Sequence, residues 1–274
     1  MKCRYYILLV CVILGLAGNL PAQNTNLINE VDSLIGRLNN KLEAGKHREK
    51  EYADELKTFD DLIAKYSDDK TGGLWAILNL KYKLDSTLFY DFINTAATLE
   101  LIKTNFPSAN TDGEIDKAIA SMQPEIEKQK IRNQFPEGSK FPDFDVKDIY
   151  GKPLSIASRK AKVVLIDFWA TWCGPCRQEI PNILDVYKKY HDQGFDVIGV
   201  SLDDDRAALD KFLIAAGMPW PEFFDGKAND NKLAVKYGIG PIPANYLLNS
   251  DGKIIDMDMR GPELEAAVAK ALKQ

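Results

Sequence analysis

One stretch decides the fold of this chain: Val163-Val-Leu-Ile-Asp-Phe-Trp-Ala-Thr-Trp-Cys-Gly-Pro-Cys-Arg177. Its first half is an apolar run with a single acid, which predicts a buried strand from Val163 to Phe168. The turn after it and the sequence Cys173-Gly-Pro-Cys176 predict a helix that begins near Cys173. Two cysteines at this spacing lie on one side of a helix's first turn and can close a small disulfide ring.

The position of Cys173 gives it a reason to be reactive. A helix N-terminus presents unpaired backbone N–H groups and a positive dipole potential. Both stabilise a thiolate, which is the nucleophilic form of cysteine. We therefore predict that Cys173 is the attacking thiolate and the exposed member of the pair. Cys176, one helical turn further in, is predicted to be the resolving cysteine.

The quoted stretch resembles the signature of the thioredoxin family, a strand ending in Asp-Phe-Trp-Ala followed by Trp-Cys-Gly-Pro-Cys. Upstream, Phe141-Pro-Asp-Phe144 and Gly151-Lys-Pro153 resemble the N-terminal hairpin of the exported branch of that family. That branch includes the reductases of cytochrome c maturation and is related to the peroxiredoxin fold. The resemblance covers about residues 141–272. It implies a thioredoxin-like α/β fold, in which a mixed sheet has helices on both faces, and the activity of a thiol–disulfide oxidoreductase.

The resemblance also implies a client-binding surface beside the cysteines. Pro243 matches the family's cis-proline, although Pro241 competes for that role. The backbone of Ile242 would pair with an extended client segment. Trp172 would shield the disulfide as an apolar flank, or would simply pack beside it.

Two acids match proton-handling positions of the family. Asp167 matches the buried acid of thioredoxin, which would relay the proton of Cys176. The alternative is a plain aspartate at the end of a strand. Glu179 matches an active-site glutamate of the cytochrome c maturation branch, or is a solvated surface acid. Thioredoxin's lysine partner of the buried acid corresponds to Gly199 here, so Asp167 is expected to lack that ion pair.

The remaining elements of this part follow the same order. Residues 218–230 read as irregular, and Asp203 to about Asn231 looks like an insertion. The pattern predicts strands at Phe141–Val146, Phe195–Ser201, Ala244–Leu248 and Ile254–Met257, and helices from Cys173 to about Gln193 and at Arg206–Ala216, Lys232–Tyr237 and Pro262–Leu272.

Residues 24–134 are predicted to form a separate all-helical module of unknown role, followed by the thioredoxin domain at 135–274. Apolar residues recur at helical spacing and predict four to six helices in antiparallel hairpins. Thr111-x-x-Glu114 resembles a capping box, and Pro124 is expected to kink or split the last helix. His47 lies among charged residues and is expected to be solvated. Partner recognition, dimerisation and spacing from a membrane are the roles that such a module could serve.

The first 22 residues differ from the rest. Lys2 and Arg4 precede an almost wholly apolar run from Tyr5 to Leu20. This pattern predicts a secretory signal peptide, residues 1–22, cut after Ala22. An uncleaved N-terminal membrane anchor is the alternative, although the run is shorter than the ~20 residues of a spanning helix. We expect a periplasmic or otherwise exported protein.

Cysteine use points to a redox-active centre. Of the four cysteines, Cys3 and Cys11 lie in the predicted leader, which leaves only Cys173 and Cys176. A purely structural disulfide is the alternative reading. Zinc needs about four ligands, and neither of the two histidines lies at ligand spacing to the pair, so we expect no metal and no cofactor. The net charge of −5, without a basic run, argues against nucleic acid as a partner.

The sequence thus predicts an exported thiol–disulfide oxidoreductase of the protein-disulfide reductase type, with a role in cell redox homeostasis. Its partners would be disulfide-containing client proteins and a membrane thiol reductase that supplies electrons. The dipeptide Gly174-Pro175 favours a reductant, because Pro175 lacks an N–H that could stabilise the thiolate. The alternative is a disulfide isomerase or oxidase that uses the helical module for client binding or as a homodimer interface. A binding module without enzymatic activity is a third reading, which the intact cysteine pair disfavours.

Overall fold

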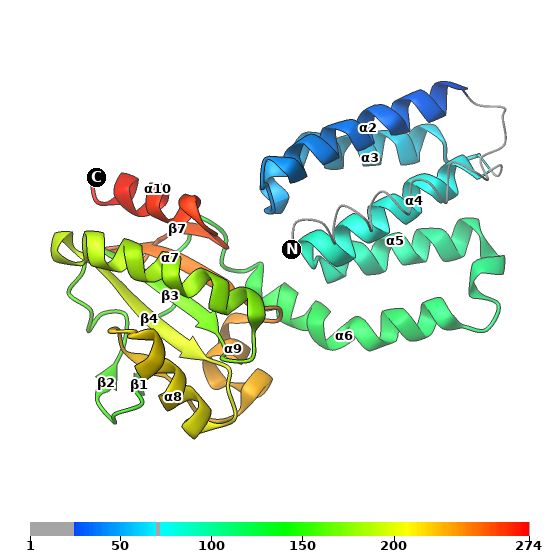
Figure 1. Cartoon of the computed structure of the whole chain (residues 1–274). Helices are drawn as coiled ribbons and strands as arrows, with labels where there is room; N and C mark the ends of the chain where they lie inside the picture. Colours follow the sequence, from blue (N-terminus) through cyan, green and yellow to red (C-terminus); the bar gives the residue numbers. More distant parts are fainter. Residues whose placement is uncertain (1–24, 70–71, 274) are drawn as a thin grey trace. The chain divides into compact units, whose positions relative to one another are not determined.

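The computed structural model describes residues 25–69 and 72–273 (Figure 1). The predicted signal peptide lies outside these residues. The contacts within the chain divide it into two compact units, Met1–Ile126 and Glu127–Gln274. None of the helices in the described part is long and apolar enough to span a membrane.

The first unit consists of helices whose apolar faces meet, as the spacing of its leucines predicted. Leu34 and Leu38 share a buried core with Tyr52 and Phe59. The α-helices are α2 (Thr25–Glu43), α3 (Ala53–Lys65), α4 (Gly73–Lys83), α5 (Phe92–Asn105) and α6 (Glu114–Arg132). The last of these runs on into the second unit, which begins at Glu127. Shorter helical turns are η1 (Glu49–Tyr52), the π-helical η2 (Leu84–Phe89) and η3 (Pro107–Asn110).

Two predictions about α6 need correction. The cap at its start comes from Asn110, whose Oδ1 accepts the Ile115 N–H at 2.9 Å, whereas the Thr111 hydroxyl donates to Ser108 O. Of the two outcomes expected at Pro124, a kink or a split, the split is not observed, because α6 runs through that residue. A proline removes one backbone donor, and the burial of Ile126 two residues further on favours continuation of the helix.

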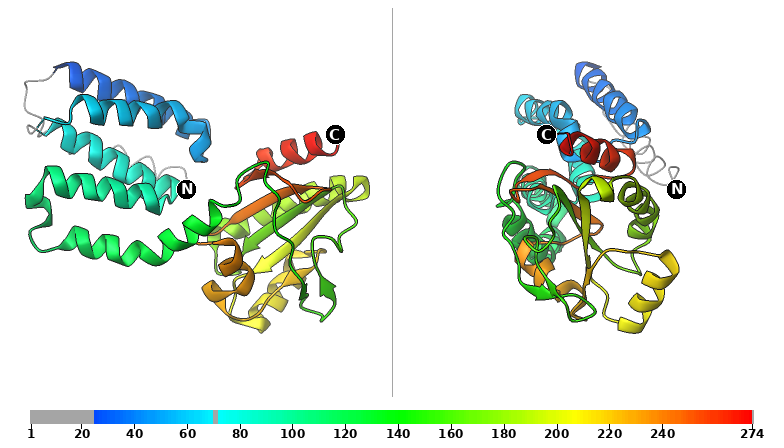
Figure 2. Two further views of the ribbon diagram at one scale, coloured as in Figure 1. Left: turned by 180° about the vertical axis from the view of Figure 1, so that it is seen from behind. Right: turned by 90° about the vertical axis from the view of Figure 1, so that its left-hand side faces the viewer.

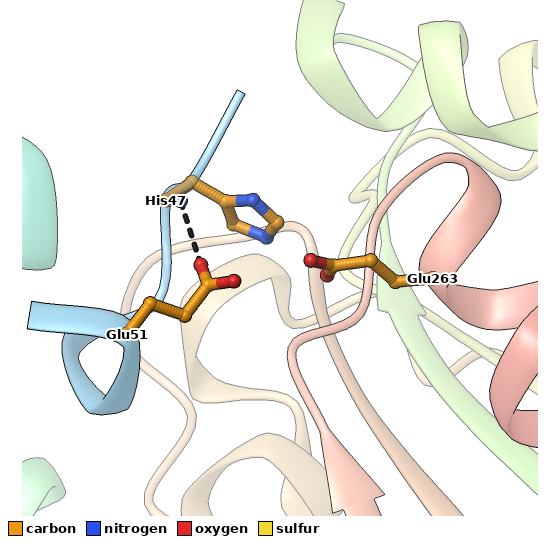
Figure 3. Close-up of side chains that lie close together, drawn as sticks. All are labelled: His47, Glu51 and Glu263. Atoms are coloured by element: carbon orange, nitrogen blue, oxygen red, sulfur yellow. Dashed lines mark hydrogen bonds between the residues drawn. The ribbon is translucent and has the colours of Figure 1, made fainter. Parts of the chain in front are cut away.

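His47 precedes η1, and its backbone N–H donates to Glu51 Oε2 at 3.0 Å (Figure 3). The Arg48 N–H donates to the same oxygen at 3.0 Å. The Glu51 side chain therefore satisfies backbone donors at the start of η1, which would otherwise lack partners.

The second unit is built on a five-stranded sheet of order β5-β4-β3-β6-β7. Figure 2 shows the same ribbon from two further sides. The strands are β3 (Val163–Trp169), β4 (Phe195–Ser201), β5 (Glu222–Phe223), β6 (Ala244–Asn249) and β7 (Ile254–Met257). β3 pairs with β4 in parallel and with β6 in antiparallel orientation, which makes the sheet mixed. A separate two-stranded ladder pairs β1 (Val146–Lys147) with β2 (Pro153–Leu154).

Helices cover both faces of this sheet. One face packs against α7 (Gly174–Tyr190) and α10 (Pro262–Ala271), with Ile183 and Leu264 in one core with Leu165. The other face carries Phe168, whose ring meets Tyr237 of α9 (Lys232–Tyr237). The remaining elements are α8 (Arg206–Ala216) and the short turns η4 (His191–Gln193) and η5 (Ala228–Asp230). This is the thioredoxin-like arrangement that the sequence predicted.

Two elements differ from the prediction. Phe141–Val146 is not a strand, since only Val146 and Lys147 pair with β2. The alternation in that segment reflects a ring cluster, in which Phe141 stacks on Tyr237 with centroids 4.2 Å apart. Conversely, the segment predicted as irregular contains β5, which pairs with Gly199 and Val200 of β4. A strand of two residues is too short to show any periodicity.

Two glycines that end helices differ in their surroundings. Gly217 after α8 and Gly238 after α9 both have positive φ, +67° and +63°. A Cβ at Gly217 would meet nothing within 4 Å, whereas one at Gly238 would lie 2.1 Å from the carbonyl oxygen of Lys128. Gly238 is therefore required by backbone packing as well as by its conformation.

The pair offers a matched test of that packing. Gly217→Ala should lower the free energy of unfolding by about 1 kcal/mol, the cost of a left-handed residue with a Cβ. Gly238→Ala should cost about 2–5 kcal/mol, because overpacking adds to the same strain. Urea unfolding of the full chain, followed by tryptophan fluorescence, measures both variants. Equal losses would contradict the packing argument.

Candidate active site

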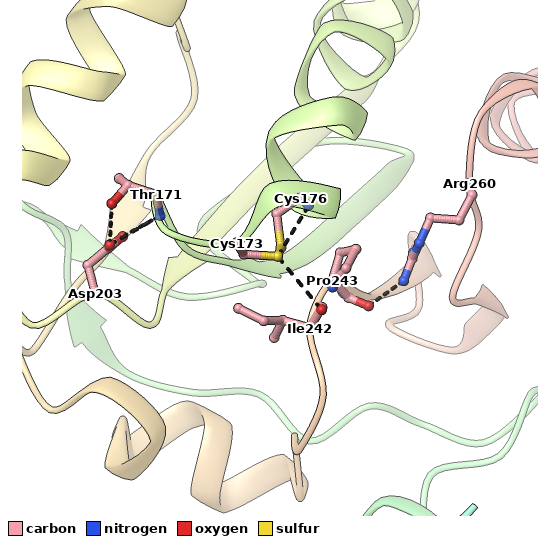
Figure 4. The surroundings of a disulfide bond; sticks show 7 residues. All are labelled: Thr171, Cys173, Cys176, Asp203, Ile242, Pro243 and Arg260. Carbon is pink, nitrogen blue, oxygen red and sulfur yellow. Dashed lines mark hydrogen bonds between the residues drawn. A yellow bond between two sulfur atoms is a disulfide. The ribbon is translucent and has the colours of Figure 1, made fainter. Parts of the chain in front are cut away.

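The cysteine pair lies where the sequence placed it, at the start of α7, and it forms a disulfide (Figure 4). Cys173 is the N-cap residue of the helix. Its Sγ accepts a hydrogen bond from the Cys176 N–H, with a distance of 3.2 Å. A backbone donor aimed at this sulfur stabilises a negative charge on it once the disulfide is opened. Closed in a disulfide, neither sulfur offers a thiolate to a metal.

The pair is more buried than predicted. Cys173 is only 5% exposed and Cys176 2%, so neither is an exposed sulfur in this disulfide form. The reason is the loop before β6, whose Ile242 carbonyl oxygen lies 3.7 Å from Cys173 Sγ (Figure 4). Trp172, in contrast, is 58% exposed and does not pack into the core. An apolar ring next to a reactive sulfur and open to solvent can contact a client.

The loop beside the sulfurs contains the cis peptide bond, between Ile242 and Pro243, and Pro241 is not involved. Arg260 donates a hydrogen bond from its Nη2 to the carbonyl oxygen of Pro243 (Figure 4). Sequence reasoning missed Arg260. It precedes α10 by two residues and reaches the loop only through the fold, so no local pattern marks it.

A second missed residue fixes the other side of the active-site turn. The carboxylate of Asp203 accepts hydrogen bonds from the Thr171 N–H at 3.1 Å and from the Thr171 hydroxyl at 2.6 Å (Figure 4). The Ser201 hydroxyl donates to the same carboxylate at 2.8 Å. A signal for Asp203 exists in the sequence, because it comes two residues after β4, a strand parallel to β3, and the carboxyl ends of such strands share one edge.

Asp167 lies in the middle of β3 and is 4% exposed. Within residues 25–69 and 72–273, no side chain or backbone group donates a hydrogen bond to its carboxyl group. Burial raises the pKa of this carboxyl to about 7, while the positive charge of Arg260 lowers it and the negative charge of Glu179 raises it. A carboxyl group with this pKa can both accept and release a proton near neutral pH.

Glu179 is half-buried rather than solvated. Its Oε2 accepts the Gly261 N–H at 2.9 Å and the Asn182 side-chain amide at 3.4 Å. Because Gly261 is the N-cap residue of α10, Glu179 ties α7 to the start of that helix. Its charge nonetheless acts on Asp167, so an anchoring contact and an electrostatic effect coincide in one side chain.

The raised pKa of Asp167 makes a prediction about stability. Its pKa is about 7 in the folded protein against 3.8 for an ordinary aspartate, so the folded state holds an extra proton between these pH values. Stability is therefore lost as the pH rises through this range. Asp167→Asn removes that loss and should stabilise the disulfide form by up to about 4 kcal/mol above about pH 7, and not at all below about pH 4. Urea unfolding at several pH values measures the difference, and a gain that does not depend on pH would contradict the assignment.

Comparisons with known proteins place the second unit in a family. Residues 138–257 match the model of the AhpC/TSA family. The thiol-disulfide oxidoreductase ResA of Bacillus thuringiensis (strain Al Hakam) is 34% identical over 119 residues, which are 43% of this chain and 67% of that protein. ResA of Bacillus subtilis (strain 168) is 31% identical over 124 residues, 45% of this chain and 68% of that protein.

A solved thioredoxin domain of a thiol-disulfide oxidoreductase from Bacteroides vulgatus is 30% identical, with a TM-score of 0.47, and covers 50% of this chain and 99% of that chain. The residues that match the AhpC/TSA model include the cysteine pair. The chain belongs to the ResA-like thiol-disulfide oxidoreductases of the thioredoxin superfamily.

Proposed function

We propose that this oxidoreductase reduces disulfide bonds of exported proteins, using Cys173 and Cys176 as a dithiol. One observation carries the proposal: Cys173 Sγ caps α7 and accepts the Cys176 N–H at 3.2 Å, beside the carbonyl of Ile242. This environment favours a thiolate at Cys173, and the thiolate is the attacking species in disulfide exchange.

The reaction proceeds in two exchanges. The Cys173 thiolate attacks one sulfur of the client disulfide, and the other client sulfur leaves as a thiolate. The Cys176 thiol then loses its proton and attacks Cys173 Sγ, which forms the Cys173–Cys176 disulfide and releases the second client sulfur. The client gains two electrons and two protons in all, and the cysteine pair is oxidised.

Asp167 accepts the proton of Cys176 in the second exchange. A base works best when its pKa lies near the operating pH, and burial brings the pKa of Asp167 to about 7. Glu179 acts on the same step through its charge, which raises the pKa of Asp167, and through its hold on the start of α10.

The client surface consists of Trp172, Ile242 and Pro243. Trp172 is largely exposed, and Ile242 and Pro243 are half-buried beside the disulfide. The carbonyl of Ile242 near Cys173 would accept a backbone N–H of an extended client segment, an edge pairing of the kind that strands form. Arg260 keeps this loop in place by its hydrogen bond to Pro243.

A reductant of exported proteins needs a source of electrons, for which a membrane thiol reductase is the class of partner we propose. The predicted leader would place the protein in the periplasm or otherwise outside the cytoplasm. The helical module at 24–134 would select clients or pair two copies, whereas the thioredoxin domain at 135–274 would perform the exchange. Apoproteins of cytochrome c maturation are one class of client that the resemblance suggests.

The two cysteines should fail in different ways. Cys173→Ser should lose the acceleration that the wild type gives to the reduction of insulin disulfides by dithiothreitol, because the attacking sulfur is missing. Cys176→Ser should still attack but should accumulate a mixed disulfide with a client, which non-reducing electrophoresis resolves. If Cys173→Ser keeps its activity, or if Cys173→Ser traps a client through Cys176 while Cys176→Ser traps none, the proposed roles are wrong.

The reduction potential decides the direction of exchange. Titration of the leader-less protein against dithiothreitol and glutathione should give a value near that of thioredoxin, about −270 mV. A value of about −180 to −120 mV would indicate an isomerase or an oxidant. In that case we would assign client selection to the helical module.

A further inference from the structure

A row of polar residues crosses the sheet beneath the active-site helix. Asn245 of β6 faces Asp167 of β3, Asp167 faces Gly199 of β4, and Gly199 faces Glu222 of β5. Register partners on neighbouring strands direct their side chains to the same face of a sheet. Asp167 and Glu222 are therefore on one face, two strands apart, with only a glycine between them.

Glu222 is a buried acid that the reaction described above does not use. It is 1% exposed. Its Oε2 accepts a hydrogen bond from Trp169 Nε1 at 3.1 Å, and its Oε1 accepts one from Trp220 Nε1 at 2.9 Å. Two indole N–H donors therefore hold both carboxyl oxygens in place, one from β3 and one from the loop before β5.

The carboxyl group of Glu222 lies over Gly199. A Cβ at Gly199 would be 2.1 Å from Glu222 Oε1 and 2.2 Å from Oε2. The glycine thus leaves the room that the carboxyl group occupies, directly beside the register position of Asp167. Any larger residue at position 199 would displace the acid, so the three residues form one arrangement.

The charges around the two acids do not neutralise them. Arg260 and Glu179 act on Asp167 with opposite signs. Asp167 and Asp203 both act on Glu222 as negative charges, while its two hydrogen-bond partners are neutral indoles. Burial raises the pKa of Glu222 to about 8, against the effect of the Trp169 and Trp220 donors.

We propose that Asp167 and Glu222 form one coupled proton site, in which Glu222 acts through Asp167 and sets the pH range over which Cys176 can give up its proton. This inference rests on the proposed role of Asp167 as proton acceptor. Glu222 does not touch the reacting sulfurs and is a positioning residue for the proton.

The coupling follows from the low dielectric of the site. Two carboxyl groups that interact strongly there titrate as a pair, since the first charge opposes the second. In the singly charged state Glu222 keeps its proton and Asp167 is free to accept one. When Cys176 reacts, its S–H bond breaks and an O–H bond forms on Asp167, and no electron passes through the acids. When Glu222 has lost its proton at higher pH, its negative charge raises the pKa of Asp167, so that Asp167 can still accept a proton.

The test compares carboxyl titrations in the disulfide form of the full chain, by NMR with ¹³C-labelled aspartate and glutamate. The wild type should show two linked titrations above about pH 6. Glu222→Gln should leave a single titration, that of Asp167. Asp167→Asn should shift the titration of Glu222 to lower pH. Trp220→Phe removes one hydrogen-bond donor to the charged form of Glu222 and should shift the titration of Glu222 to higher pH. This variant replaces Glu222→Gln if the latter does not fold. If the two acids titrate independently, so that no substitution shifts the titration of the remaining acid, the proposal of a coupled site is wrong.

The functional readout is the pH profile of the second exchange, measured as the release of a thiol from a preformed mixed disulfide at Cys173. Glu222→Gln should reduce two inflections to one, with rates at low pH close to the wild type. Asp196→Asn is the control, because Asp196 is a buried acid of β4 that is paired with Arg159 at 2.6 Å and lies outside the row. It should keep the wild-type profile.

The outcomes separate the two proposals. If Asp167→Asn leaves the second exchange unchanged, the proposed proton acceptor is wrong. If Asp167→Asn slows it at least tenfold while Glu222→Gln keeps two inflections, the proton acceptor stands and the coupled site is overturned.

Discussion

The complete burial of β3 is the constraint on which the rest of the second unit depends. All seven residues of this strand are buried, and β4 and β6 pair with it on either side. A strand in this position cannot shift its register without moving an entire set of side chains to the wrong face. The turn after the strand is therefore held firmly, and with it the start of α7 and the cysteine pair.

The same burial turns one acid into a proton-sensitive group. A carboxyl group on the central strand loses its hydration, and its ionised form becomes costly. Asp167 bears this cost without a hydrogen-bond donor from the described residues, and the compensating charge of Arg260 comes from the segment between β7 and α10. Proteins keep such groups at sites where the energetic cost serves a reaction. Glu222, which accepts hydrogen bonds from two indoles, is a second buried acid whose pKa is raised by burial.

The site is assembled from segments that are distant in the chain. Asp203 holds the turn before the cysteines, the Ile242–Pro243 bond lies against the sulfur, and Arg260 supports that loop. Each comes from a connection at an end of a different strand, which is where α/β proteins generally collect their functional groups. The rigid sheet positions these loops, so that a disulfide with little exposed surface still lies next to a surface on which a client could bind.

The sequence by itself determined the fold family, the cysteine pair and most of the elements, because these rest on local patterns. The apolar run before Cys173, the glycines after α8 and α9 and the spacing of leucines in α2 are all visible without coordinates. Only the tertiary structure decided which acids meet. Gly199, Glu222 and the two tryptophans become one site through strand pairing, and Arg260 reaches Pro243 only when α10 is in place. Pairing between distant strands has no local signature, and the pKa of a carboxyl group depends on burial that a sequence pattern does not measure.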